Sequence, residues 1–193
     1  MLLLKKANSR LIERNDTVLI VIDVQEKLVP LVIRNNEIIS NIVKLIKFCK
    51  KLQIPIIITE QYPKGLGKTV REISEELQEI KPIEKTSFSC FGSEEFKKAL
   101  RKIKAKTLIL VGVEAHICIA QTALDALDRF RVCIVADAIS SRSVENLNIG
   151  LQRMRDNGVI ISSTEMLMYE LLKDSKSKEF KDMKHLLQDS KFN

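Results

Sequence analysis

Three side chains of complementary chemistry, a carboxylate, an ammonium and a thiol, lie at or just beyond the ends of apolar segments. Asp23 and Lys85 each end such a segment, and Cys118 lies five residues beyond the apolar run at 107–113. Catalysis by a cysteine nucleophile needs a thiolate, a proton carrier and donors for the developing oxyanion. We predict that Cys118 supplies the sulfur and that Asp23 takes its proton and returns it to a leaving amine. Backbone N–H groups around Glu114 and Cys118 are the expected oxyanion donors.

The expected surroundings of Cys118 favour its thiolate form. A helical pattern runs from about residue 115 to 130, which places Cys118 in the first turn, near unpaired N–H groups and the positive end of the helix dipole. A neighbouring ammonium from Lys85 would lower the thiol pKa further. Each residue also has a structural alternative: a core thiol, a helix-capping carboxylate or a solvated lysine. Their occurrence at three strand ends favours the catalytic interpretation.

The elements that must position these residues alternate between strands and helices. Apolar, β-branched runs predict strands at 17–23, 54–60, 80–84, 106–113, 131–136 and 158–162. Apolar residues at helical spacing predict helices over about 38–52, 93–103, 115–130, 147–157 and 175–188, and another that begins with a capping box at 162–165. The tail helix would carry Phe180, Met183 and Leu187.

This alternation predicts an α/β three-layer sandwich. Its strands are apolar enough to be covered on both faces, which is typical of a mostly parallel sheet with helices on both sides. In such sheets ligands bind beyond the carboxyl ends of the strands, where Asp23, Lys85 and Cys118 would converge.

Composition indicates one globular domain over residues 1–193, 45% hydrophobic and 30% charged. No apolar run approaches the ~20 residues of a membrane helix, and Leu2-Leu3-Leu4 is shorter than the roughly 7–15 residues of a signal-peptide core. The segment up to Arg14 is basic, like a transit peptide, but it contains Glu13 and little serine. We therefore expect a cytoplasmic protein rather than one imported into an organelle.

Charge and cysteine patterns narrow the function classes. The net charge of +7 is interleaved with acids, as in 176–184, which favours a solvated surface over a nucleic-acid interface. The four cysteines include no C-x-x-C pair, and no G-x-G-x-x-G motif follows a strand. These patterns favour free thiols in a reducing compartment and argue against redox or dinucleotide chemistry. We expect a small-molecule substrate and no cofactor.

Several neighbours of the three residues have both a functional and a structural interpretation. The functional role is the same for all of them, binding of substrate, and the residues are Gln25, Tyr62, Phe88, Phe91 and His116. The structural alternative is helix or turn capping for Gln25 and His116, a subunit contact for Tyr62, and core packing for the two phenylalanines. The loop at 60–68, with two glycines and a proline, is expected to shape the mouth of the cleft. Sequence leaves the role of Cys90 open and predicts that Cys49 and Cys133 are inert core thiols and that Asp137 is a turn or cap residue.

Three motifs occur in order along the chain: Val18-Leu-Ile-Val-Ile-Asp-Val-Gln25, then Lys85-Thr-Ser-Phe88, then Val111-Gly-Val-Glu-Ala-His-Ile-Cys118. Together they resemble the isochorismatase-like superfamily of cysteine hydrolases, which includes nicotinamidases and N-carbamoylsarcosine amidohydrolases. Thr59-Glu-Gln-Tyr-Pro-Lys-Gly-Leu-Gly67 and the segment 112–118 resemble more narrowly the isochorismatase domain-containing proteins. The resemblance covers roughly residues 15–170.

The resemblance implies a six-stranded parallel sheet of order 3-2-1-4-5-6. It also implies that Cys118 is the nucleophile, that Asp23 is the general base and that Lys85 is the charge that tunes both. A cis peptide bond between Val113 and Glu114 would aim the Glu114 N–H at the oxyanion. The family further implies a homo-oligomer, a dimer or a tetramer.

The chain also departs from the family pattern. Nicotinamidases hold a metal with an Asp-x-His motif after the second strand, where this chain has Glu60-Gln61-Tyr62, so we expect no metal site. True isochorismatases do not use this cysteine to open a vinyl ether. We therefore expect hydrolysis of a small amide, carbamoyl or ureido compound through a covalent acyl-enzyme. The alternative is a catalytically silent member of the fold, a binding or oligomeric scaffold, because neither a metal motif nor a recognisable arginine for a substrate carboxylate is found.

Overall fold

The computed structural model describes residues 11–188, so the basic N-terminal segment lies largely outside the described residues. Its centre is a sheet of six parallel strands in the order β3-β2-β1-β4-β5-β6. The strands are β1 Thr17–Ile22, β2 Ile56–Gln61, β3 Ile83–Lys85, β4 Thr107–Val113, β5 Arg131–Ser140 and β6 Ile160–Ser162. The predicted fold class and strand order are confirmed.

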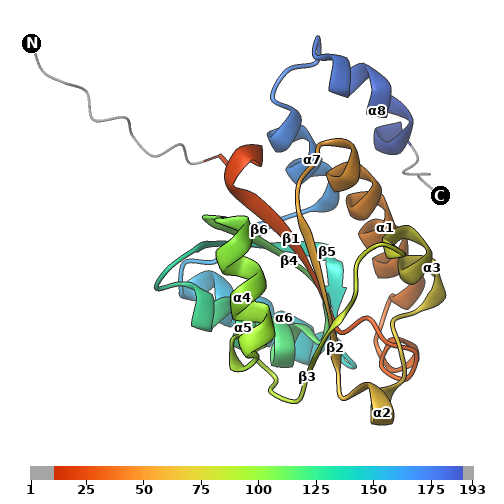
Figure 1. Ribbon diagram of the computed structural model, residues 1–193, viewed down its shortest axis with the longest axis vertical. Coiled ribbons are helices and arrows are strands. Elements are labelled where there is room, and N and C mark those ends of the chain that lie inside the picture. The colour runs from red at the N-terminus through yellow and green to blue at the C-terminus, as the bar shows by residue number, and fades with distance from the viewer. Residues whose placement is uncertain (1–10, 189–193) are drawn as a thin grey trace, which may run out of the picture.

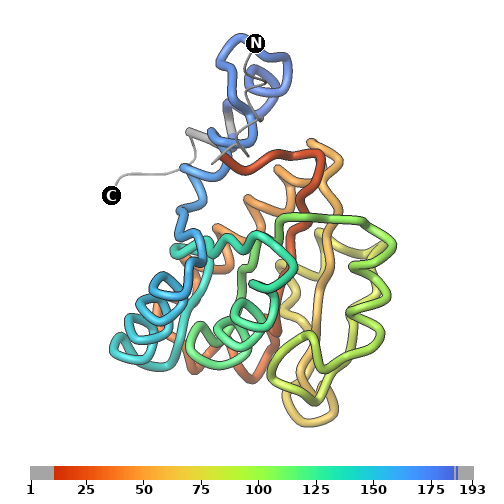
Figure 2. The backbone as a smooth tube through the Cα atoms, turned by 90° about the vertical axis from the view of Figure 1, so that its left-hand side faces the viewer, coloured from red at the N-terminus to blue at the C-terminus, as the bar shows by residue number. Residues whose placement is uncertain are grey.

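Helices cover both faces of this sheet (Figures 1 and 2). Residues of one core cluster lie on α1 Asn35–Lys51, α3 Arg71–Ser74, α7 Thr164–Leu172 and α8 Lys178–Gln188. Residues of the other cluster lie on α4 Glu94–Ile103, α5 Ala120–Ala126 and α6 Val144–Asp156. The short helix α2, Pro63–Leu66, follows β2. No helix in the described part of the chain combines the length and apolarity needed to cross a membrane.

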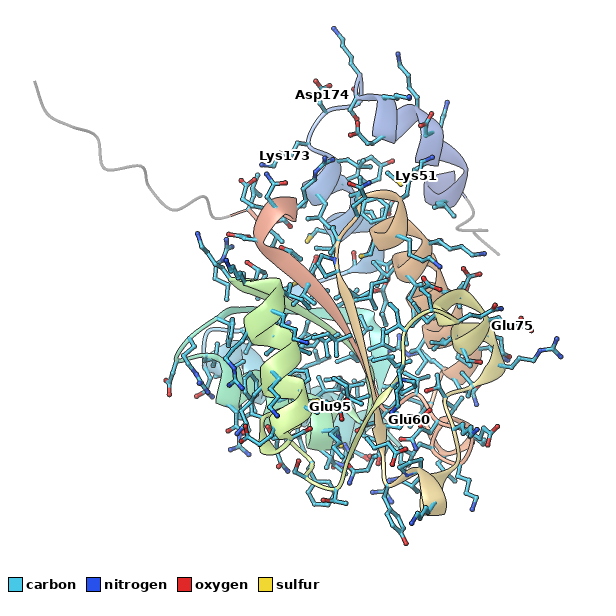
Figure 3. The ribbon with its side chains drawn as sticks, viewed as in Figure 1. Lys51, Glu60, Glu75, Glu95, Lys173 and Asp174 are labelled. Carbon is cyan, nitrogen blue, oxygen red and sulfur yellow. The ribbon has the colours of Figure 1, made fainter. Side chains whose placement is uncertain are left out.

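The alternation of side chains along β1 shows why the sheet needs two covering layers. Val18, Ile20 and Ile22 are fully buried in one core cluster, whereas Leu19 and Val21 are fully buried in the other. Successive side chains of a strand point to opposite faces, so a strand that is apolar at every position must be covered on both. The carboxyl ends of the strands lie at the lower end of Figure 1; Figure 3 places Glu60, near the end of β2, at this end.

All six strands differ from their predicted bounds by at least one residue, and the third and fifth differ most. The third strand was expected at 80–84 and is Ile83–Lys85, so it begins only after Pro82, which has no N–H to donate. The fifth was expected to end at 136 and continues to Ser140 because of an irregularity in its pairing with β4. Asp137 therefore lies within β5, and its Oδ1 accepts from the N–H and hydroxyl of Thr164 at the start of α7.

The helices that follow β4 and β6 also begin differently from the prediction. A π-helical turn, Ala115–Ile119, precedes α5, so Cys118 lies in this π turn and not in the first turn of an α-helix. Before α7 the N-cap is Ser163, whose side chain accepts from the N–H of Met166, so the capping box expected to start at Ser162 is wrong by one residue. The tail helix forms with Met183 buried, while the side chain of Leu187 lies outside the described part of the structure.

Candidate active site

Asp23 and Lys85 form a buried ion pair at the carboxyl edge of the sheet. Lys85 Nζ donates to Asp23 Oδ2 over 2.6 Å, and neither side chain is exposed. Asp23 directly follows β1, Lys85 ends β3, and β2 lies between these two strands. The parallel topology therefore brings together two groups that are 62 residues apart in the sequence.

The Lys85 ammonium lies among oxygen atoms of the protein. Apart from Asp23, Nζ lies 2.7 Å from Gln61 Oε1 and 3.2 Å from the carbonyl oxygens of Ser87 and Phe88. Gln61 ends β2, and the two carbonyls belong to the loop that follows β3. The ammonium thus connects Asp23 after β1, Gln61 at the end of β2 and the loop after β3, which are neighbouring segments at the carboxyl edge of the sheet.

The charge of Lys85 is maintained despite its burial. Burial by itself lowers the pKa of this ammonium, but the charge of Asp23, with contributions from Cys90 and Cys118, outweighs that effect and raises the pKa above its ordinary value. Lys85 is therefore a permanent cation at neutral pH and serves as the counter-ion of Asp23.

Cys118 reaches the same ion pair from the π turn after β4. Cys118 is 6% exposed, and its thiol lies near enough to Asp23 and Lys85 to interact electrostatically with both. Burial raises the pKa of the Cys118 thiol, the charge of Asp23 raises it further, and the attraction of Lys85 opposes this rise without cancelling it. The predicted preference for a thiolate is therefore wrong: the sulfur keeps its proton in the resting protein because burial and Asp23 outweigh Lys85.

The π turn is fixed to the loop after β5 by two side chains. The peptide bond between Val113 and Glu114 is cis, as the resemblance implies. The Glu114 carboxylate accepts from the backbone N–H and Nε of Arg142 at 3.0 and 3.1 Å. His116 Nδ1 lies 2.9 Å from Ser141 Oγ. Of the two roles considered for His116, this contact favours bracing of the turn.

Gln25 braces the edge of the site. Its Nε2 donates to the carbonyl oxygens of Gln61 and Gly67, and its Oε1 accepts from the N–H of Gln61 over 2.7 Å. The amide is fully buried, and both of its N–H donors are engaged within the protein, which leaves neither for a substrate. On the opposite face of the sheet, the Glu60 carboxylate accepts from the N–H and hydroxyl of Thr69. The segment 60–68, which was expected to be a loop, instead contains the end of β2 and the helix α2, and these contacts anchor it.

The three aromatic candidates differ in position. Phe91 packs against Phe96 and Phe130 in the core, which is its structural alternative. Phe88 and Tyr62 are both 54% exposed at the carboxyl edge of the sheet. Tyr62 and Lys85 line an open hollow of about 430 Å³, which is completed by Pro63, Lys64, Glu84, Thr86, Ser87, Gly92 and Ser93.

With this geometry established, comparison with known proteins identifies the family. The model of the isochorismatase domain matches residues 17–166. The chain is a member of the isochorismatase family. Isochorismatase domain-containing protein 2 of Danio rerio is 43% identical over 173 residues, which are 89% of this chain and 86% of the fish protein. The isochorismatase family protein 1A of Dictyostelium discoideum is 37% identical over 91% of this chain and 87% of that protein.

Solved structures of the isochorismatase fold show the same architecture. The MAR1 ribonuclease of Caenorhabditis elegans is 36% identical, with a TM-score of 0.87, and covers 93% of both chains. The Escherichia coli YcaC gene product, described as an octameric hydrolase of unknown specificity, is 25% identical, with a TM-score of 0.83 over 88% of this chain and 86% of that one. The chain therefore has an isochorismatase-family hydrolase fold.

The metal motif of nicotinamidases has no counterpart at the corresponding position of this isochorismatase-family chain. Glu60 binds Thr69, Gln61 binds Lys85, and Tyr62 is half exposed, so these side chains do not form a ligand set. Within residues 11–188, no three His, Cys, Asp or Glu side chains are grouped as metal ligands would be.

Three residues of the site were not assigned a role by the sequence analysis. Gln61 contacts Lys85, Thr59 contacts Asp23 through a 2.7 Å hydrogen bond, and the buried Cys90 interacts electrostatically with both Asp23 and Lys85. A sequence signal existed for two of them. Thr59 and Gln61 lie two residues apart at the end of a predicted strand, so they share a face at the edge where ligands bind.

Cys49 and Cys133 lie in the core away from this site, and burial raises the pKa of each thiol to about 12. Because an unfolded thiol ionises near pH 9, the folding free energy that each contributes is fully present below pH 9 and declines as the pH rises towards 12. At pH 10.5 the loss is about 2 kcal/mol for each thiol. We expect the free energy of unfolding, measured in urea, to fall less between pH 8 and pH 10.5 in Cys49→Ala than in the wild type. Parallel pH dependences would contradict this expectation.

Proposed function

We propose that the protein is a cysteine-dependent hydrolase of small amide, carbamoyl or ureido compounds. The observation that carries the proposal is the buried ion pair of Asp23 and Lys85, with which the Cys118 thiol interacts. A thiol, a base and a fixed counter-ion in one buried cluster supply what nucleophilic attack on a carbonyl carbon requires.

In the first half of the reaction Cys118 forms a thioester. Asp23 takes the thiol proton as Sγ bonds to the carbonyl carbon, and backbone N–H groups around Glu114 and Cys118 stabilise the oxyanion. Collapse of the tetrahedral intermediate breaks the C–N bond, and the leaving amine or ammonia takes the proton from Asp23. Transfer of the proton during attack suits a thiol whose pKa is raised, because no free thiolate has to accumulate.

In the second half water hydrolyses the thioester. Asp23 takes a proton from the water as its oxygen bonds to the acyl carbon, and the proton then returns to the Cys118 sulfur as the acid leaves. Lys85 does not need to touch the substrate in this scheme. Its four oxygen contacts hold it beside Asp23, where it stabilises the carboxylate form between the two proton transfers.

The test is the selectivity of covalent labelling. We expect iodoacetamide and a small aldehyde to modify Cys118 at least about tenfold faster than Cys49 or Cys133, measured by intact-protein mass spectrometry with peptide mapping. Cys118 lies beside the Asp23–Lys85 pair and is more exposed than either core thiol. Cys118→Ala should remove the fast adduct, and Cys133→Ala should keep it. Equal labelling of all buried cysteines would reject the nucleophile.

A second measurement separates an enzyme from a silent scaffold of the same fold. Release of ammonia from a panel of primary amides, ureas and carbamoyl amino acids, lost in Cys118→Ala, supports hydrolysis. Fast labelling without turnover of any panel member, together with stabilisation of the wild type by these compounds, would favour the binding function instead.

The ribonuclease name of the nematode structure raises RNA as another substrate. The candidate site favours a small molecule. The side chains of Asp23 and Lys85 are fully buried and Cys118 is 6% exposed, so a polynucleotide backbone has poor access to them. The amide proposal therefore fits this burial better.

We also infer that the chain forms a homo-oligomer. The octameric state given for the Escherichia coli neighbour supports this inference. Exposed apolar side chains such as Leu31 and Phe88, 58% and 54% exposed, are consistent with a contact between subunits.

A further inference from the structure

Both carboxylate oxygens of Asp23 accept a hydrogen bond from the protein. Oδ2 accepts from Lys85 Nζ, and Oδ1 accepts from Thr59 Oγ1 over 2.7 Å. Thr59 is fully buried on β2, and its backbone carbonyl also accepts from the N–H of Asp23 over 3.2 Å. One residue of the neighbouring strand thus holds both the main chain and the side chain of Asp23.

Cys90 is a further buried residue beside this cluster. It is fully buried, and its N–H donates to Thr122 Oγ1 over 3.0 Å. Thr122 follows Cys118 by four residues, so Cys90 packs next to the helix that continues from the π turn. Its thiol interacts electrostatically with Asp23 and Lys85.

The direction of the hydrogen bond between Thr59 and Asp23 follows from the protons available. A carboxylate paired with a buried ammonium has no proton to give, so the single hydroxyl proton of Thr59 is directed at Asp23. Thr59 thus holds Oδ1 while Lys85 holds Oδ2.

We propose that Thr59 is a positioning residue for the general base, whose carboxylate its hydroxyl holds directed at Cys118. The inference rests on the proposed function of Asp23. The charged or titratable groups that face Asp23 are Lys85 from β3, Cys118 from the π turn and Cys90 from the turn before α4. Thr59 is a neutral donor among these groups, so it can hold the carboxylate without adding a charge.

Removal of the Thr59 hydroxyl should slow the transfer of the Cys118 proton. In Thr59→Val, Asp23 Oδ1 loses the hydrogen bond that holds it, so the carboxylate is less well positioned to accept that proton. We expect Cys118 to be labelled roughly tenfold more slowly in Thr59→Val than in the wild type.

The experiment measures the rate of Cys118 alkylation by iodoacetamide at pH 7.5. In this reaction the S–C bond forms, iodide leaves, and the thiol proton passes to Asp23. Thr59→Ser keeps the hydroxyl and should restore the wild-type rate. Thr164→Val is the matched control, because it removes a buried threonine hydroxyl from a different carboxylate, that of Asp137, and should leave the rate unchanged.

The outcomes separate this inference from the function on which it rests. If wild-type Cys118 shows no fast labelling, the proposed function fails. If the wild type labels rapidly and Asp23→Asn loses that reaction, but Thr59→Val keeps the wild-type rate, only the positioning role is overturned. A loss of rate in Thr59→Val that Thr59→Ser fails to restore would also overturn it, because a purely structural defect has that signature. Should Thr59→Val not fold, Thr59→Ala takes its place and the same two outcomes decide.

Discussion

Lys85→Met is expected to lower the free energy of unfolding by about 3–5 kcal/mol and to abolish the fast labelling of Cys118. The variant leaves the Asp23 carboxylate fully buried without its cation. Such a carboxylate becomes protonated or admits water, and in either state it is a poor acceptor for the thiol proton. The carbonyls of Ser87 and Phe88 would also lose a donor, which loosens the loop after β3.

The chain offers a matched control for this substitution. Lys50 pairs with Glu79 over 3.0 Å, but the two side chains are 41% and 60% exposed. Lys50→Met makes the same chemical change at a solvated pair, where water replaces the lost partner, and should leave the free energy of unfolding nearly unchanged. Urea unfolding of the two variants at pH 7.5 gives the comparison.

The double variant Asp23→Asn/Lys85→Met isolates the role of burial. Removal of both charges avoids an unpaired buried ion, so we expect it to recover part of the stability lost in Lys85→Met. It should not recover labelling, because the carboxamide that replaces the Asp23 carboxylate is not a base. If Lys85→Met were as stable as Lys50→Met, the buried ion pair would not be the determinant of stability that the structure indicates.

The sequence was sufficient to place Asp23 and Lys85 in one site. Their positions depend on topology: each ends a strand, and all strand ends of a parallel sheet meet at one edge. The placement of neither residue depends on side-chain detail. The positions of the strand ends in the sequence were therefore enough to predict that the two groups meet. The limits of β5 were harder to predict, because its pairing irregularity beside Leu110 and Gly112 depends on contacts with β4 that local sequence does not encode.

The state of Cys118 shows what sequence could not supply. Sequence indicated the attraction of Lys85 and a helix terminus, both of which lower a thiol pKa. Whether the thiol pKa is raised or lowered depends on how deeply Cys118 is buried and on whether Asp23 or Lys85 affects it more strongly. Both depend on packing. Gln25 is a similar case, since its type allows contact with substrate and only the positions of Gln61 and Gly67 show that its amide is engaged.

The second large effect is expected at Gly112, near the end of β4. Its φ is +115°, and a Cβ atom there would lie 2.1 Å from the carbonyl oxygen of Ile22 and 2.9 Å from its carbonyl carbon. These are backbone atoms of the adjacent strand, paired in register with Gly112, so they are unable to rotate away as a side chain would. Gly112→Ala must therefore separate the ends of β1 and β4, between which Asp23 and Cys118 meet.

We expect Gly112→Ala to destabilise the protein by about 4 kcal/mol or more, from the combined cost of a disfavoured φ and of overpacking. Gly158→Ala is the control, because Gly158 also has a positive φ, +91°, but a Cβ there meets nothing within 4 Å. Its cost should be limited to the backbone term of about 1–2 kcal/mol. The difference between the two thermal midpoints measures the steric contact alone, and labelling of Cys118 should be lost in Gly112→Ala only. Equal midpoints would contradict this prediction, because they would mean that β1 and β4 can separate at their carboxyl ends without cost.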